Sequence, residues 1–244
     1  MNGDQLEKLT TEIAREDNWQ ITNHAYYTDP NTQKPREKDN IATAQQFSEE
    51  DPRAYTVRLF IECKTLPKAT KINLKDIGMG EIQNTLFTHR IPYAKISEIE
   101  EHRKTHFYQY KDVFNPKDTS DFIYTAINQN LQSFAAFRKT NPESALYYLI
   151  VVYDGTLYTI DKNAIATTCN NALIQVESID NTFMLPNRKC FIELVSISQL
   201  SGLLKRIKED IQEINKSSCF YYRMEKKALA EKRRQVKAYM NRHI

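Results

Sequence analysis

The spacing of apolar residues along the chain predicts several β-strands. In residues 55–64 apolar side chains occupy every second position, at Val57, Leu59 and Ile61, which is the period of a strand. A continuous apolar run at 146–153, rich in Val, Ile and Tyr, predicts a buried central strand. Shorter strands are expected at 20–28, 39–44, 157–160 and 189–195. Asp154-Gly155 is typical of a hairpin turn and predicts pairing between the two strands that flank it.

A second period, in which apolar residues recur every three or four positions, predicts helices between these strands. The expected helices are 4–18, 119–139, a segment that Ser198 would cap and that runs to about 214, and a last one at about 219–242. The mixture of the two periods indicates an α/β fold. Residues 66–118 show neither period clearly and are expected to form an insertion, as a lid or a recognition element.

Length and composition are those of a globular protein of one or two units. The chain has 244 residues, of which 41% are hydrophobic and 27% charged. No apolar run approaches the length of a membrane span, and the start of the chain does not resemble a signal peptide. The four cysteines are far apart, which favours reduced thiols and a cytoplasmic location without a membrane.

The charge is unevenly distributed along the chain. Residues 203–244 hold 12 Lys or Arg against 5 Asp or Glu, a balance of +7, which leaves −4 for the rest of a chain whose total is +3. We therefore expect a domain at 1–202 and a basic C-terminal helical segment at 203–244. A cluster of cations in that segment predicts contact with the phosphates of a nucleic acid: Lys226, Lys227, Lys232, Arg233, Arg234 and Lys237. The alternative is a solvated helix face.

The chemistry that the sequence suggests centres on three residues. Asp39 begins one expected strand, and Glu62 and Lys64 lie near the end of another, 23 positions further on. Glu62 and Lys64 are two residues apart, so on a strand both side chains point to the same face. Two carboxylates beside a lysine are the groups that metal-assisted hydrolysis of a phosphodiester requires.

At these residues the chain resembles the PD-(D/E)XK nuclease superfamily. The resemblance covers about residues 4–66: a helix, a strand, a strand that begins with Asp39, and a strand that ends in the motif Glu62-Cys63-Lys64. Lys38 stands before Asp39, where the family has a proline. The resemblance implies a restriction-endonuclease-like mixed β-sheet core flanked by helices, and a Mg²⁺-dependent endonuclease that acts most often on DNA.

The resemblance also implies roles for individual residues. Asp39, Glu62 and the backbone carbonyl of Cys63 would bind Mg²⁺ or Mn²⁺, and Lys64 would orient the attacking water. Glu7 of the first helix would support a second metal ion or hold Lys64, with Glu16 as the second choice for a helix carboxylate. Gln129 would face the substrate or the metal. A defence or restriction nuclease, or the effector subunit of a defence complex, fits this set.

Three alternatives compete with this interpretation. Glu62 and Lys64 could form an exposed salt bridge on an edge strand, worth under about 1 kcal/mol. The fold could serve as a catalytically inactive module that binds nucleic acid or protein. An NTPase or a dinucleotide enzyme is not supported, because neither of the glycine-rich phosphate loops occurs. Both a homo-oligomer and a subunit of a larger complex are compatible with the composition.

Overall fold

The computed structural model describes residues 1–28, 33–46, 55–66, 70–72, 74–76, 107–110, 122–140, 145–160, 166–168, 170–177, 189–216 and 234. Its helices are α1 (Gly3–Glu16), α4 (Phe122–Thr140) and α5 (Leu200–Lys216), and a short 3₁₀ turn, η1 (Ile197–Gln199), precedes α5. The long strands are β1 (Gln20–Thr28), β2 (Pro35–Gln46), β3 (Tyr55–Thr65), β7 (Ala145–Asp154), β10 (Asn171–Glu177) and β11 (Lys189–Ser196). The short strands are β4 (Thr70–Ile72), β5 (Leu74–Asp76), β6 (Phe107–Tyr110), β8 (Leu157–Ile160) and β9 (Ala166–Thr168).

Eight of these strands form one mixed sheet in the order β1-β2-β3-β7-β11-β10-β6-β5. β1, β2 and β3 are antiparallel neighbours, whereas β3, β7 and β11 run parallel to one another. The parallel pair β3 and β7 requires a crossover connection, and that connection contains α4. β4, β8 and β9 form a separate three-stranded sheet.

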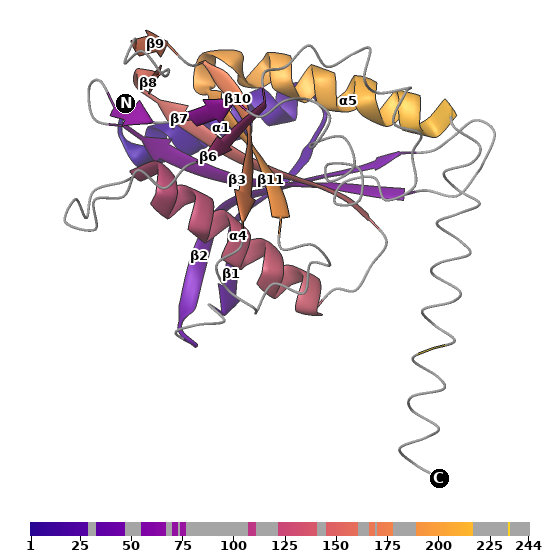
Figure 1. Ribbon diagram of the computed structural model, residues 1–244. Coiled ribbons are helices and arrows are strands. Elements are labelled where there is room, and N and C mark those ends of the chain that lie inside the picture. The colour runs from indigo at the N-terminus through magenta and orange to yellow at the C-terminus, as the bar shows by residue number, and fades with distance from the viewer. Residues whose placement is uncertain are drawn as a thin grey trace.

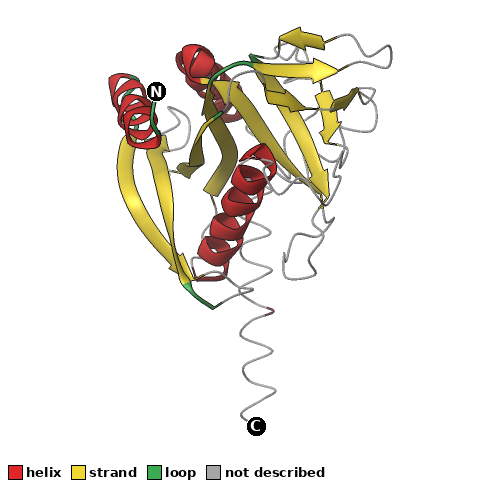
Figure 2. Ribbon diagram, turned by 90° about the vertical axis from the view of Figure 1, so that its left-hand side faces the viewer, coloured by secondary structure: helices red, strands yellow, loops and turns green. Residues whose placement is uncertain are grey.

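Helices cover both faces of the main sheet, with α5 above it and α4 below it in Figure 1. On one face α1 and α5 bury the odd-numbered side chains of β3, among them Val57, Leu59 and Ile61. On the other face α4 packs Ile123, Ile127, Leu131 and Phe134 against Phe60 and β7. Figure 2 shows the sheet between the helices from the side. The alternating pattern in β3 therefore lies inside the protein, with both faces buried.

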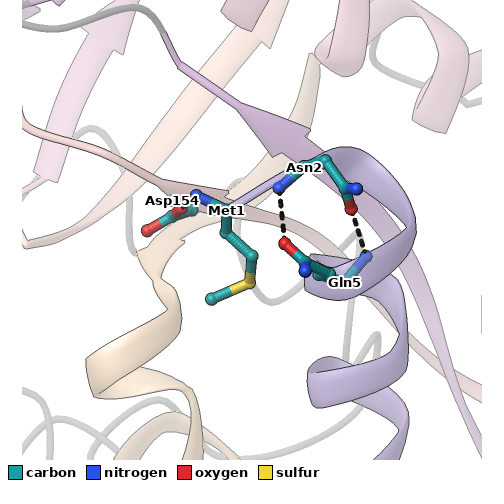
Figure 3. A network of polar contacts seen from close by, with 4 residues as sticks. All are labelled: Met1, Asn2, Gln5 and Asp154. Carbon is teal, nitrogen blue, oxygen red and sulfur yellow. Dashed lines mark hydrogen bonds and ion pairs between the residues drawn. The ribbon is translucent and has the colours of Figure 1, made fainter.

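The first helix, α1, begins with a capping box between Asn2 and Gln5. The Asn2 side chain accepts a hydrogen bond from the Gln5 amide at 2.8 Å, and the Asn2 amide donates to the Gln5 side chain at 3.0 Å (Figure 3). This reciprocal capping box satisfies two amides that the first turn of a helix leaves without partners. At the other end of the helix, the ammonium group of Lys208 on α5 lies 3.0 Å from the Asp17 carboxylate. The capping box thus stabilises the start of α1, and the ion pair joins its end to α5.

The structure confirms a central mixed sheet flanked by helices and corrects two local predictions. β7 and β8 do not form a hairpin, because β8 pairs with β4 and β9 in the second sheet. The glycine between them, Gly155, has φ +124° and turns the chain out of the main sheet. Ser198 does not cap α5 directly, since it lies within η1, two residues before α5 begins at Leu200.

The expected insertion at 66–118 contributes strands wherever it is described. β5 and β6 extend the main sheet at its far edge, and β4 begins the second sheet. Within the described ranges, no helix combines the length and apolar character needed to cross a membrane.

Candidate active site

The strands that carry Asp39 and Glu62 separate at these two residues. The paired register of β2 and β3 runs from Gln46 opposite Tyr55 to Asn40 opposite Ile61. Beyond that point β2 continues beside β1, whereas β3 continues beside β7 as far as Thr65. The β1–β2 pair extends past the rest of the sheet in Figures 1 and 2. The two strands thus form a fork, and we use this word for the residues at which β2 and β3 part: Asp39 on β2, and Glu62, Cys63 and Lys64 on β3.

The Asp39 carboxylate closes the base of the fork. Its Oδ2 accepts a hydrogen bond from the backbone N–H of Cys63 at 2.6 Å. The side chain therefore supplies the acceptor that the β2 main chain would supply if the ladder continued. On a strand the N–H and C=O of one residue point to the same edge, so the Cys63 carbonyl also faces the fork and Asp39. This carbonyl is the oxygen that the family resemblance assigns to a metal ion.

Glu62 and Lys64 lie on the central strand of the fork. Glu62 is only 4% exposed, and it pairs with Val151 of β7 on the face that α4 covers. Lys64 pairs with Tyr153 two positions further on the same face and is partly buried. The alternative of an exposed salt bridge on an edge strand is therefore wrong, because β3 lies between β2 and β7 and Glu62 is buried.

The Cys63 thiol reports the charges around it. Burial, and after it the negative charges of Asp39, Glu7 and Glu62, raises the pKa of this thiol from 9.0 to about 12, against a lowering contribution from its hydrogen bond with Thr10. The Cys63 Sγ lies 3.5 Å from the Thr10 hydroxyl oxygen of α1. Carboxylates from a helix and two strands thus act on one buried group. Asp39 and Glu62 lie at the fork on neighbouring strands, whereas Glu7 belongs to α1, which covers the face of β3 opposite to Glu62.

The position of Glu7 follows from how α1 begins. The Met1 amino group lies 3.1 Å from the carboxylate of Asp154, the last residue of β7 (Figure 3). Asp154 pairs with Thr65 at the end of β3, and its carbonyl accepts the Leu66 N–H at 2.8 Å. The first turn of α1 therefore lies over the carboxyl ends of β3 and β7, and Glu7 follows one turn later. Glu16, the second choice, is exposed at the far end of the helix.

A groove beside α1 makes Glu7 accessible from outside. Its volume is about 470 Å³. Residues from α1 and one residue from β1 line it: Asp4, Glu7, Lys8, Thr11, Glu12, Arg15 and Asn23. Glu7 is thus shared between this groove and the charges that surround Cys63.

The oxygen atoms of the fork fit a hard divalent cation. Among the described residues, no group of three or more His, Cys, Asp and Glu side chains is arranged to hold a metal ion. Mg²⁺, however, usually binds through one or two carboxylates and keeps several waters, and the fork offers two carboxylates and one carbonyl. The Cys63 thiol is not part of this set, because its raised pKa keeps it protonated and only a thiolate binds metal well.

The polar residue of α4 that reaches β3 was not anticipated from the sequence. Gln129 is partly buried, and its Oε1 has no hydrogen-bond partner in the described part of the chain. Its neighbour Asn130 is fully buried and donates to the carbonyls of Phe60 at 3.0 Å and Ile150 at 2.8 Å. The helical period contains the signal for this, since Asn130 lies three residues after Ile127 and four before Phe134, within the buried stripe.

A second buried glutamate belongs to a different environment. Glu193 of β11 is 6% exposed and pairs with Ile150 on the face that α1 and α5 cover. It is separated from β3 by the whole of β7. Two positions after Glu193 stands Val195 and not a lysine, so the sequence predicts a structural role for this residue, which offers a matched control for Glu62.

The basic residues of the C-terminal segment fall largely outside the described residues. Arg234 is described, as an exposed helical residue. The other five cations of the predicted phosphate-binding set lie outside the described ranges: Lys226, Lys227, Lys232, Arg233 and Lys237. Their role stays a prediction. Comparisons of the chain with protein-family models, with curated proteins and with solved structures find no match.

Proposed function

We propose that this chain is a metal-dependent nuclease with a restriction-endonuclease-like core, which hydrolyses phosphodiester bonds, most readily in DNA. The observation that carries the proposal is the fork. There the Asp39 carboxylate lies on the Cys63 amide at 2.6 Å, and Asp39, Glu7 and Glu62 all act on the Cys63 thiol. Two carboxylates lie where the two strands separate, and one of them, Glu62, is only 4% exposed. Burial of such a group costs stability and marks a candidate functional site.

Each residue of the fork has a distinct role in this proposal. Asp39, Glu62 and the Cys63 carbonyl would hold Mg²⁺ or Mn²⁺, which when bound neutralises charge on the scissile phosphate and lowers the pKa of a water. Lys64, on the same face as Glu62, positions that water and donates hydrogen bonds to the phosphate oxygens. Glu7 contributes negative charge from α1, on the face of β3 opposite to Lys64, where it would support a second cation rather than hold Lys64.

The rest of the chain would serve substrate binding. The nuclease domain would extend past the expected boundary at 202 and include α5, because Leu203, Leu204 and Ile207 belong to the core beneath it. The basic segment beyond α5 would contact phosphates without reading base edges. Its cations would make binding strongly dependent on salt, because each neutralised phosphate releases counterions. A role in defence against foreign DNA, alone or as the effector of a larger complex, is consistent with a free-standing nuclease of this kind.

The test is incubation of the purified protein with plasmid DNA, single-stranded DNA and RNA in Mg²⁺, Mn²⁺ or EDTA. We expect cleavage with either cation and none with EDTA. Lys64→Ala should abolish cleavage, whereas Lys34→Ala, which removes an exposed lysine just before β2, should not. Cleavage in EDTA would contradict the mechanism, and failure to cleave any of these substrates would favour the nuclease-like binding module.

A further inference from the structure

Asn130 is a buried polar residue in an otherwise apolar stripe of α4. It is 0% exposed, and its neighbours on the same face of the helix belong to the core that packs against Phe60. Its side-chain Nδ2 donates two hydrogen bonds, to the carbonyls of Phe60 on β3 and Ile150 on β7. One amide group therefore joins α4 to both central strands.

The two carbonyls that Asn130 contacts lie directly beside Glu62. Cys63 turns its N–H toward β2, where Asp39 accepts it. Because main-chain groups alternate along a strand, Glu62 turns its own N–H toward β7. There its partner is Val151, and Ile150 immediately precedes Val151. Phe60 lies two residues before Glu62, so its main-chain groups also point toward β7. Asn130 thus holds β3 to β7 at the last position before the fork.

Asn130 contacts β3 at the point where this strand loses one of its two neighbours. Beyond Ile61, β3 loses β2 as a neighbour on one edge, so β7 is the strand that still supports it. The Asn130 Oδ1 has no hydrogen-bond partner among the described residues, and a buried unsatisfied oxygen is unfavourable. A leucine would continue the apolar stripe without that cost. The asparagine therefore carries a function of its own.

We propose that Asn130 is a positioning residue that keeps Glu62 in register at the fork. The proposal rests on the proposed nuclease function, since it gives Asn130 a role through the Glu62 carboxylate. Residues behind metal ligands commonly change metal affinity or activity by about 10- to 100-fold when they are replaced. A displacement of about 1 Å at a reacting group is enough for an effect of that size.

The test compares Asn130→Leu and Asn130→Asp with Ser133→Ala. Ser133 is a matched control, because it is also buried on α4 and its hydroxyl donates to the Asn130 carbonyl of the same helix at 2.9 Å. Three quantities are measured on the full-length protein: Mn²⁺ affinity by calorimetry, kcat and KM for DNA cleavage, and amide hydrogen exchange at Ile61, Glu62 and Cys63. Leucine removes both donors, and aspartate keeps the size of the side chain if leucine prevents folding.

We expect both Asn130 variants to lower kcat by about 10- to 100-fold with KM little changed, to weaken Mn²⁺ binding and to speed exchange at Glu62. Ser133→Ala should leave all three near the wild-type values. A lower melting temperature in the Asn130 variants with normal kcat and normal exchange would show a purely structural role and overturn the inference. If the wild-type protein neither binds Mn²⁺ nor cleaves DNA, the proposed function has failed. Unchanged amide hydrogen exchange at Glu62 in Asn130→Leu would separately refute the positioning role of Asn130.

Discussion

Replacement of Asp39 separates the structural role of its carboxylate from its role as a metal ligand. Asp39→Asn keeps an oxygen that can accept the Cys63 N–H, whereas Asp39→Ala leaves that amide without its partner. A buried donor that loses its acceptor costs about 1–3 kcal/mol. In a chain of 244 residues, 1 kcal/mol shifts the melting temperature by about 2–4 °C, so Asp39→Ala should melt about 2–12 °C below the wild type.

The asparagine variant should behave differently in the absence of metal. It exchanges a charge-assisted hydrogen bond for a weaker neutral one, but it also removes one of the three negative charges around Cys63. These two effects oppose each other, so we expect the melting temperature of Asp39→Asn to stay within about 4 °C of the wild type. The Cys63 pKa should fall, because the Asp39 charge contributes to raising it.

Added Mn²⁺ then reports the ligand role in a thermal melt. At a concentration of about 100 times Kd, a ligand that binds only the folded protein stabilises it by about 2.7 kcal/mol, or about 5–11 °C here. Both Asp39 variants should lose this shift, and Glu193→Gln, which neutralises the other buried glutamate, should keep it. A full Mn²⁺ shift in Asp39→Asn would show that Asp39 is not a ligand. A wild-type melting temperature in Asp39→Ala would refute the reasoning about the fork bond.

Three further predictions concern other parts of the protein. Lys64→Ala should keep the wild-type Mn²⁺ shift while cleavage is abolished, because lysine is not a ligand; disappearance of the shift would place Lys64 in the metal site. Because the pKa of Cys63 is raised, the thiol stays protonated in the folded chain up to about pH 12, whereas in the unfolded chain it loses its proton above about pH 9. The stability that this difference contributes is present below about pH 9 and is lost as the pH rises toward about 12. The free energy of unfolding of Cys63→Ala, measured by denaturant titration at each pH, should fall less steeply over that window than that of the wild type. Parallel plots of this free energy against pH would exclude a buried neutral thiol. Truncation near residue 217 should make nucleic-acid binding, measured by fluorescence anisotropy, depend less steeply on salt. The slope of log K against log salt concentration should fall by roughly one unit for each phosphate that the segment no longer neutralises. An unchanged slope would assign the segment to packing or assembly.

Much of the fold follows from local patterns. The helix at α1, the long strands β3, β7 and β11, and the helix α4 all lie within a few residues of their expected positions. In α1, β3 and α4 the apolar period distinguishes a helix from a strand, whereas β7 follows from a continuous run rich in Val, Ile and Tyr. The hairpin expected after Asp154 was wrong, because a turn motif specifies only a change of direction. The partner of β8 depends on β4, which lies far away in the sequence.

The candidate residues were named from the sequence, but their arrangement was not. Glu62 and Lys64 share a face because a strand has a period of two, and this holds wherever the strand is placed. Whether that strand lies at an edge or in the centre depends on its pairing with β7, a contact between residues about 90 positions apart. For this reason the sequence alone left the surface salt bridge as an alternative, and the tertiary structure removed it.

The sequence by itself determined which side chains could carry the chemistry, since residue type and strand period fix the donors and the face that they share. Only the tertiary structure decided that β2 and β3 part at Asp39, that Glu7 approaches from α1, and that Asn130 rather than Gln129 reaches β3. The physical reason is that the fork and the Asn130 contact both depend on packing between elements that are distant in the sequence. Such packing produces no local periodic pattern of apolar residues.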